Sequence, residues 1–302
     1  MPIEKKIKLG LIGAGKWGIN YIKTIEKLKE ISLVAVSSRN KTIKNIIPKD
    51  CVLYEDWKQI FMSKEIDGII VSSPTDTHYK ICKEIINRKI PLLSEKPLAT
   101  NIEEVKNLLE LCKRGKTILM VNYIHLYHHE FKKIEKIIQR NNFSRLRNIN
   151  SESGNYGPFR KDTRALWDWG VHDIAMTLKL SREYPYKVES KYLKVSSKGF
   201  MHGEIIEAKL YFPSNMKAIL NFGNLKERKI KKFTASTDLK SFIYDPFNEK
   251  NNVNIAINDQ PLGNCIKEFA EKINNKLISF KDIELTLQIT KVIHTIENQL
   301  KQ

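Results

Sequence analysis

The sequence has few cysteines, and their spacing argues against two kinds of stabilising site. Its 302 residues contain four: Cys51, Cys82, Cys112 and Cys265, with no Cys-x-x-Cys pair. Widely spaced cysteines suggest neither a disulfide framework nor a zinc site, and we expect no bound metal. Cys82 and Cys112 fall on apolar helix faces, so buried, unreactive thiols are the better interpretation.

Long apolar runs are also missing. No stretch reaches the ~18 uninterrupted apolar residues of a membrane span. The first residues lead straight into a strand-like run and lack the apolar core of a secretory signal. We therefore expect a cytoplasmic protein that does not act at a membrane.

Acidic residues are scarce relative to basic ones, with 34 Asp and Glu against 52 Lys and Arg and a formal net charge of +18. Such an excess can indicate nucleic-acid binding. The lysines, however, are scattered along the whole chain, and no recognised nucleic-acid module occurs. We interpret the charge as a compositional bias on solvated faces and expect no nucleic-acid partner. A positive field could still attract a phosphorylated substrate.

The first 122 residues alternate between strand and helix patterns. Short apolar runs predict strands at 7–12, 32–37, 52–54, 68–72, 91–94 and 118–121, and helical spacing predicts helices at 16–29, at 77–88 and from 101. Strands alternating with helices imply right-handed crossovers and a doubly wound parallel sheet. Residues 1–122 are therefore predicted to form an α/β dinucleotide-binding domain of the Rossmann type.

Residues 123–302 have a different pattern, in which strand follows strand. Strands are predicted at 148–153, 186–196, 204–212, 217–222, 229–236 and 241–244, and helices at 130–140, 167–180, 266–273 and 282–300. This order predicts an α+β domain with an open, mostly antiparallel sheet for substrate binding and oligomerisation. Whether the last helix packs back on the first domain is left open. Because one sheet face would be uncovered, we expect a homodimer or homotetramer.

A glycine-rich turn follows the first predicted strand. The segment Gly13, Ala14, Gly15, Lys16, Trp17, Gly18 matches G-x-G-x-x-G and opens a predicted helix, the context that makes this pattern informative. Gly13 would make the tight turn, Gly15 would let a pyrophosphate approach, and Gly18 would allow close helix–strand packing. The helix N-terminus offers free N–H groups and partial positive charge. The alternative is a glycine turn that binds nothing.

The end of the second strand bears on the choice of cofactor. NAD enzymes usually carry Asp or Glu there for the ribose 2′-hydroxyl, whereas this chain has Ser37, Ser38 and Arg39. Ser38 and Arg39 suit a 2′-phosphate, because guanidinium pairs well with phosphate oxygens. We therefore expect NADP to be preferred over NAD. The alternative is that Arg39 is a solvated loop residue and both cofactors bind.

Three further motifs occur in a fixed order. They are Ser72-Ser73-Pro74-Thr75-Asp76-Thr77-His78, Glu95-Lys96-Pro97-Leu98-Ala99 and Trp167-Asp168-Trp169-Gly170-Val171-His172-Asp173-Ile174. This set resembles the Gfo/Idh/MocA oxidoreductase family, over nearly the whole chain. The resemblance implies a Rossmann domain followed by an α/β domain. It also implies reversible, NAD(P)-dependent hydride transfer at a hydroxyl or keto carbon of a sugar, nucleotide sugar or cyclitol.

The same resemblance assigns site residues. The catalytic group would be Lys96, Asp168 and His172, which would also contact substrate. Cofactor contacts would come from Ser73, Pro74, Thr75, His78, Glu95 and Lys96, and further substrate contacts from Tyr123, His125, Tyr156 and Arg160. The family often has Tyr-x-Arg where this chain has Tyr123-Ile124-His125, so His125 is a departure. The Lys96–Pro97 peptide bond is expected to be cis, which proline makes accessible.

The three catalytic candidates suit oxidation of an alcohol. A histidine such as His172 is a natural acid or base near neutral pH. Asp168 lies four residues earlier on a predicted helix, hence on the same face, and the Lys96 ammonium can stabilise alkoxide character. Each also has a plainer interpretation: His172 as a core residue, Asp168 as a helix N-cap, and Lys96 as a solvated lysine.

Two other functions remain open at this point. Some relatives with this fold bind dinucleotide without catalysis and act as sensors or regulators. The joint presence of Lys96, Asp168 and His172 argues against that role, because a sensor has no need of all three. A nucleic-acid binder would rest on charge alone.

Overall fold

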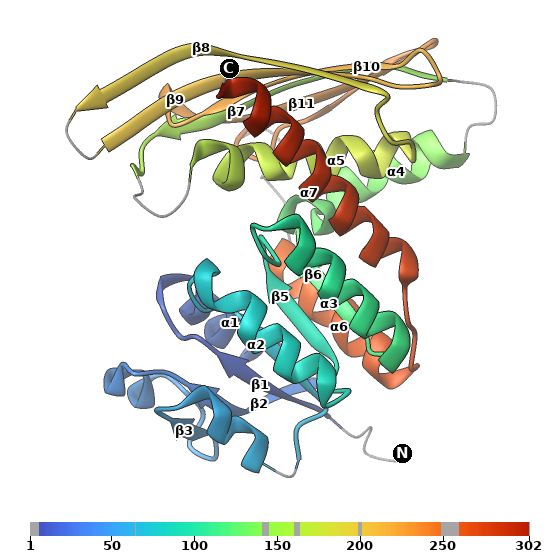
Figure 1. Cartoon of the computed structure of the whole chain (residues 1–302). Helices are drawn as coiled ribbons and strands as arrows, with labels where there is room; N and C mark the ends of the chain where they lie inside the picture. The colour runs from blue at the N-terminus through green and yellow to red at the C-terminus, as the bar shows by residue number, and fades with distance from the viewer. Residues whose placement is uncertain are drawn as a thin grey trace. The chain divides into compact units, whose positions relative to one another are not determined.

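The computed structural model describes residues 6–63, 65–140, 145–159, 164–198, 201–248 and 260–301. The chain divides into two compact units (Figure 1). Unit 1 comprises Met1–Ile124 and Ile257–Leu287, and unit 2 comprises His125–Ala256 and Gln288–Gln302. Unit 1 is therefore built from two separate stretches of the chain.

Unit 1 contains the predicted doubly wound sheet. Its strands are β1 (Ile7–Ile12), β2 (Ile31–Ser37), β3 (Val52–Tyr54), β4 (Gly68–Val71), β5 (Leu92–Glu95) and β6 (Leu119–Asn122). They pair in the order β3-β2-β1-β4-β5-β6, and every pair is parallel. Every residue of β4, β5 and β6 is buried, as expected for parallel strands covered on both faces. The Rossmann prediction is confirmed.

Helices connect and cover these strands. They are α1 (Lys16–Ile25), α2 (Thr75–Asn87), α3 (Ile102–Gly115), α6 (Pro261–Asn274) and the start of α7 (Phe280–Leu300), with short 3₁₀ helices η1 (Lys41–Asn45) and η2 (Trp57–Met62). The C-terminal helix α6 packs closely on β4, because a Cβ atom at Gly68 would lie 2.7 Å from Ile273 and 3.0 Å from Phe269. Residues far along the sequence thus complete the core of unit 1.

Unit 2 is built on a second six-stranded sheet. Its strands are β7 (Leu146–Tyr156), β8 (Lys187–Lys198), β9 (Met201–Tyr211), β10 (Lys217–Gly223), β11 (Leu225–Thr237) and β12 (Ser241–Tyr244). They pair in the order β12-β11-β7-β10-β9-β8. The central β7–β10 pair is parallel and all other pairs are antiparallel. The predicted mostly antiparallel sheet is confirmed.

Helices of unit 2 lie on one face of this sheet, where α4 and α5 run beneath the strands in Figure 1. The elements are η3 (Ile124–Tyr127), α4 (His129–Arg140), η4 (Leu166–Gly170), α5 (Val171–Ser181) and the C-terminal part of α7. Side chains of β10 and β11 such as Leu220, Phe222 and Phe233 are fully buried. Burial alternates along β10, the pattern of a sheet with one covered face.

One predicted helix has a different form from the expected one. The sequence predicts a continuous helix over 167–180, whereas the structure has a π-helical turn at Leu166–Gly170 that runs into α5.

Within the part of the chain that the structure describes, no helix combines the length and apolar character needed to cross a membrane.

Candidate active site

The glycine turn of unit 1 joins β1 to α1 and has little room for side chains. Gly13 has a φ of +93°, and a Cβ atom there would lie 2.5 Å from the backbone nitrogen of Ser73. A Cβ atom at Gly18 would lie 2.1 Å from the carbonyl oxygen of Gly13. The Ser72 hydroxyl donates to that carbonyl at 2.6 Å. Gly13 and Gly18 are therefore required by the turn itself.

Gly15 differs from these two glycines because it faces open space. A Cβ atom built on Gly15 would meet no other atom within 4 Å. Gly15 is the N-cap of α1, a position where no side chain caps the helix, and the first turn carries no acidic residue. Free N–H groups and partial positive charge at such a helix end attract a phosphate group. The residues present therefore fit a dinucleotide pyrophosphate.

The segment after β2 presents the side chains expected for adenosine ribose recognition. Arg39 is exposed and Ser38 is half-buried. The Ser38 hydroxyl accepts from the backbone N–H of Asn40 at 3.1 Å. Asn40 in turn caps η1 by accepting from the backbone N–H of Thr42 at 3.1 Å. This small capped turn, which the sequence did not suggest, holds the Ser38–Arg39 corner in place.

The loop after β4 is tied to the loop after β5 by a buried histidine. His78 is 1% exposed, and its Nδ1 lies 2.7 Å from the carbonyl oxygen of Pro97. Its Nε2 lies 2.8 Å from the carbonyl oxygen of Ser73. The family resemblance implied that His78 contacts the cofactor. The structure makes it a link between two loops at the carboxyl edge of the sheet, where ligands of such folds bind.

The other predicted cofactor residues of this loop begin α2. Pro74 is its N-cap and Thr75 its first residue. The Thr77 hydroxyl lies within hydrogen-bond distance of the Ser73 hydroxyl, at 2.7 Å, and of the Pro74 carbonyl, at 2.6 Å. These contacts join residues at the start of α2 to one another and hold Ser73 in place.

Glu95 at the end of β5 is held by three donors from two elements, α1 and β6. Its Oε1 accepts from the indole N–H of Trp17, from the Tyr21 hydroxyl at 2.6 Å and from the Asn122 amide at 2.7 Å. Glu95 is only 8% exposed. Burial, and then the neighbouring Glu95 carboxylate, raise the pKa of Tyr21, which keeps its hydroxyl protonated as a donor.

Lys96 follows Glu95 and is half-buried. The Lys96–Pro97 peptide bond is cis, as predicted. With Glu95 anchored on one side and the Pro97 carbonyl bound by His78 on the other, the backbone at Lys96 is held from both sides. The sequence placed Trp17 and Glu95 with the cofactor but did not indicate that they contact each other.

In unit 2, Asp168 and His172 lie on the π-helical turn and the start of α5. Asp168 is the middle residue of η4, and His172 is the second residue of α5 and 9% exposed. Ala165 is the N-cap of η4, so the interpretation of Asp168 as an N-cap is not what the structure shows. A π turn also has more residues per turn than an α-helix, so spacing by four does not define a shared face here. Such turns occur frequently at functional sites.

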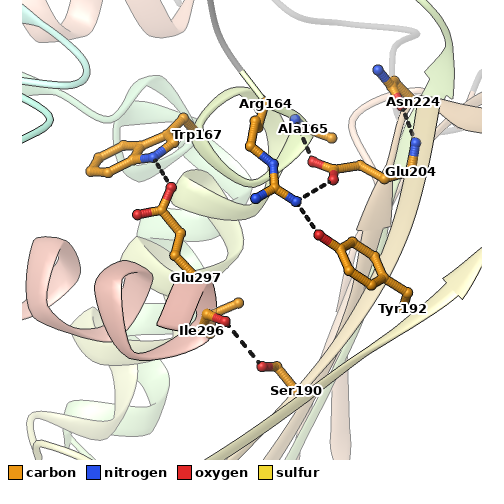
Figure 2. Close-up of polar contacts among 9 residues, drawn as sticks. All are labelled: Arg164, Ala165, Trp167, Ser190, Tyr192, Glu204, Asn224, Ile296 and Glu297. Carbon is orange, nitrogen blue, oxygen red and sulfur yellow. Dashed lines mark hydrogen bonds and ion pairs between the residues drawn. The ribbon is translucent and has the colours of Figure 1, made fainter. Parts of the chain in front are cut away.

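The chain entering this π turn is anchored to the sheet, as Figure 2 shows. The Arg164 guanidinium donates to the Tyr192 hydroxyl and to Glu204 Oε2, the latter at 2.7 Å. The Ala165 backbone N–H donates to Glu204 Oε1 at 3.0 Å. A single buried carboxylate thus binds both the side chain and the backbone where the turn begins.

Trp167 is fixed by a different partner. Its indole N–H donates to Glu297 of α7 at 2.8 Å (Figure 2). The residue is buried and its ring also meets His294 edge to face, with centroids 5.9 Å apart. This environment indicates that Trp167 packs within unit 2.

A buried ion pair holds the residue that follows His172. Asp173 is fully buried, and its Oδ1 accepts from the Lys231 ammonium at 2.5 Å. The Ser151 and Ser153 hydroxyls of β7 also donate to this carboxylate. Lys231 is 1% exposed although it belongs to a short basic run that the sequence assigned to solvated faces. These contacts join α5 to β7 and β11, and so hold the helix that carries His172.

The remaining predicted substrate residues have dissimilar environments. Tyr123 is buried in unit 1, where its hydroxyl contacts Thr286 and burial raises its pKa. Tyr156 is exposed at the end of β7, and its ring packs edge to face on Phe159. His125 contacts the Tyr244 hydroxyl at 2.8 Å. Arg160 lies outside the described residues.

The cysteines have the character predicted for them. All four are buried and free of disulfides. Burial raises the pKa of Cys51, Cys82 and Cys112 to about 12 in each case.

Among the described residues, no cluster of three or more His, Cys, Asp or Glu side chains is placed to hold a metal ion.

Comparisons with known proteins agree with this architecture. Residues 7–123 match the family described as the oxidoreductase family with an NAD-binding Rossmann fold. The rhizopine catabolism protein MocA of Rhizobium meliloti is 23% identical over 205 residues, 66% of this chain and 65% of that protein. The scyllo-inositol 2-dehydrogenase (NADP(+)) IolW of Bacillus subtilis is 25% identical over 188 residues, 58% of this chain and 51% of that protein. The matched segments therefore span from half to two thirds of these relatives' length.

A solved structure extends the likeness of the fold to both units. The scyllo-inositol dehydrogenase of Lactobacillus casei, with bound NAD(H) and scyllo-inositol, has a TM-score of 0.86 at 17% identity. The match covers 98% of this chain and 97% of that one. The family match over residues 7–123, the names of these relatives and the strand order of unit 1 support a Gfo/Idh/MocA family oxidoreductase.

Proposed function

We propose that this oxidoreductase transfers a hydride between a nicotinamide cofactor and a hydroxyl or keto carbon of a sugar, nucleotide sugar or cyclitol. The observation that carries the proposal is the open space at Gly15 over the uncapped N-terminus of α1. A Cβ atom at Gly15 would meet no protein atom within 4 Å, so the backbone there is open to the approach of a phosphate group. The substrate class is supported by relatives named as inositol dehydrogenases, including one of Thermotoga maritima.

The proposed roles follow from the chemistry of the side chains. The bound cofactor would supply or accept the hydride. His172 would take the hydroxyl proton during oxidation and return it during reduction. Lys96 would stabilise negative charge on the reacting oxygen, and Asp168 would bind the substrate or favour a charged imidazole. Lys96→Met and His172→Gln should each lower kcat by orders of magnitude while cofactor binding persists.

The glycines provide the sharpest test of the cofactor site. Gly15→Ala adds a methyl group only to the open space, so we expect unchanged thermal stability but NADPH affinity weakened at least about tenfold, as fluorescence titration would measure. Gly18→Ala should destabilise the fold, because its Cβ atom would clash with the Gly13 carbonyl. Gly263→Ala, in α6, is the matched control, since its Cβ atom meets only Thr24 at 3.7 Å. Equal NADPH affinity in Gly15→Ala and Gly263→Ala would refute the proposed site.

We also propose that NADP is preferred over NAD. The hydroxyl of Ser38 and the exposed guanidinium of Arg39 suit a 2′-phosphate, and one relative is named as an NADP(+) enzyme. Arg39→Leu should weaken NADPH binding and leave NADH binding nearly unchanged. An equal loss for both cofactors would mean that Arg39 does not select between them.

A dinucleotide-binding sensor without catalysis is the second candidate. Screening inositols, sugars, sugar phosphates and nucleotide sugars while following NAD(P)H absorbance separates the two. Turnover with any of them eliminates the pure sensor, whereas tight NADPH binding without turnover across the panel favours it.

We further propose that the protein forms a homodimer or homotetramer in the cytoplasm through the sheet of unit 2. Large apolar side chains on its outer strands, Leu193, Val195 and Ile243, are 45–60% exposed. Light scattering after gel filtration tests this, and a purely monomeric protein at micromolar concentration would contradict it.

A further inference from the structure

His125 of unit 2 belongs to a cluster of rings that includes the proposed catalytic imidazole. The ring centroids of His125 and His172 are 5.0 Å apart, with the planes at 85°. His125 Nδ1 lies 2.8 Å from the hydroxyl oxygen of Tyr244. Tyr244 is fully buried and also packs edge to face on His128 and Phe131. These contacts indicate a role for His125 other than direct substrate binding.

The Tyr244 hydroxyl determines which nitrogen of His125 carries a proton. Burial, and then the carboxyl groups of Glu130, Asp173 and Asp245, raise the pKa of Tyr244, so the phenol stays protonated. A buried O–H group requires an acceptor, and His125 Nδ1 is the partner that the structure places on it. Nδ1 must then carry a lone pair, and the proton of a neutral imidazole resides on Nε2.

Charged groups from every neighbouring element act on this cluster. The carboxylates of Glu130 in α4 and Asp245 after β12 favour a protonated His125 imidazole. Burial raises the pKa of Glu130, so a smaller fraction of its carboxyl group is ionised at a given pH. Asp173 of α5 is paired with Lys231 of β11.

The neighbouring histidines are His128, between η3 and α4, His129 of α4 and His172 of α5. If His125 were protonated, its Nδ1–H would face the Tyr244 O–H, and both groups of this buried contact would be donors. The positive charge would also lie on a ring whose centroid is 5.0 Å from that of His172. The direct hydrogen bond therefore outweighs the more distant carboxylates.

We propose that His125 is a positioning residue, kept neutral by the Tyr244 hydroxyl, that allows His172 to accept a proton during the reaction. The inference rests on the proposed function, in which His172 is the acid–base group. If the His125 ring stays neutral, His172 is the only one of the two imidazoles that becomes positively charged during the reaction. A permanent cation at position 125 would oppose the charged form of His172.

The first experiment needs no activity. In protein labelled with ¹⁵N-histidine, NMR between pH 5.5 and 8.5 should show His125 as the neutral Nε2–H tautomer throughout. His125→Gln identifies the His125 signals by their loss. In Tyr244→Phe, His125 should begin to titrate within this range. A wild-type His125 that takes up a second ring proton within this pH range would overturn the proposal, whether or not the protein is a dehydrogenase.

The second experiment measures the pH profile of kcat/KM for oxidation, whose acid limb reports protonation of the base. His125→Arg should move that limb to lower pH by about one unit, the size expected for a nearby like charge. His125→Gln lowers the rate without moving the limb, because it adds no charge. An unmoved limb in His125→Arg, with turnover retained, would overturn the coupling and leave the proposed function intact. Absence of turnover in the wild type would instead count against the proposed function, and the NMR result would still decide the state of His125.

Discussion

A buried carboxylate lies near the predicted site residues in each unit, Glu95 in unit 1 and Asp173 in unit 2, and these two are held in different ways. Glu95 of unit 1 accepts hydrogen bonds from three uncharged donors, those of Trp17, Tyr21 and Asn122. Asp173 of unit 2 is paired with the Lys231 ammonium. In the first arrangement the donors leave the negative charge in place, and in the second an opposite charge neutralises it. Removing one partner should therefore have very different effects in the two units.

The largest effect is expected for Lys231→Met. This change keeps the length of the buried side chain but leaves the Asp173 carboxylate without its counter-charge, which costs about 3–5 kcal/mol of unfolding free energy. Urea denaturation followed by circular dichroism measures the loss. Lys232→Met, at the exposed neighbouring position on β11, is the control and should change stability by less than about 0.5 kcal/mol. Similar values for both variants would show that the ion pair does not hold unit 2 together.

An intermediate effect is expected at Glu95. Glu95→Ala leaves three buried or partly buried donors without their acceptor, and should destabilise the protein by about 1–3 kcal/mol. Glu95→Gln keeps an acceptor oxygen and should destabilise it less. Glu103→Gln, on the exposed face of α3, is the control for the loss of a carboxylate in the same unit. If Glu95→Gln were as damaging as Glu95→Ala, the negative charge rather than the acceptor would be what the three donors require.

The smallest effect concerns a neutral acid buried in unit 1. Burial raises the pKa of the Cys82 thiol from 9.0 to about 12. Between these two values the unfolded chain loses the proton and the folded chain keeps it, so stability falls as pH rises from 9 towards 12. By pH 10 this amounts to roughly 1 kcal/mol. The loss of stability between pH 8 and 10 should therefore be smaller in Cys82→Ala than in the wild type, as denaturation at each pH would show. Parallel curves would mean that Cys82 is accessible to solvent.

The sequence was a good guide wherever local backbone geometry decides the structure. The positions of Gly13 and Gly18 are dictated by a positive φ and by close approach, and such requirements are visible in a short motif. The alternation of strands and helices, and the buried strand β4, follow from hydrophobic pattern in the same way. The six strands of unit 1 and their parallel pairing therefore agreed with the prediction.

Contacts between distant residues were not predictable. Trp17 and Glu95 are 78 residues apart in the sequence, and His125 and Tyr244 are 119 residues apart. No short sequence motif can therefore predict either contact. Lys231 looked like a solvated lysine, because its burial depends on how β11 lies against α5. The π turn at Leu166–Gly170 was read as ordinary helix, since its apolar spacing is compatible with both forms. These features depend on tertiary packing, which a single sequence does not specify.

The return of α6 to unit 1 has a consequence for how the protein is made. Strand β4 emerges from the ribosome about 200 residues before the side chains of Phe269 and Ile273 that lie against Gly68. A nascent chain ending before Asn274 thus exposes part of the apolar surface that the finished Rossmann unit conceals. A fragment stopping at Ile124 should consequently aggregate or bind chaperones, and adding residues 257–287 as a separate peptide should restore a compact fold.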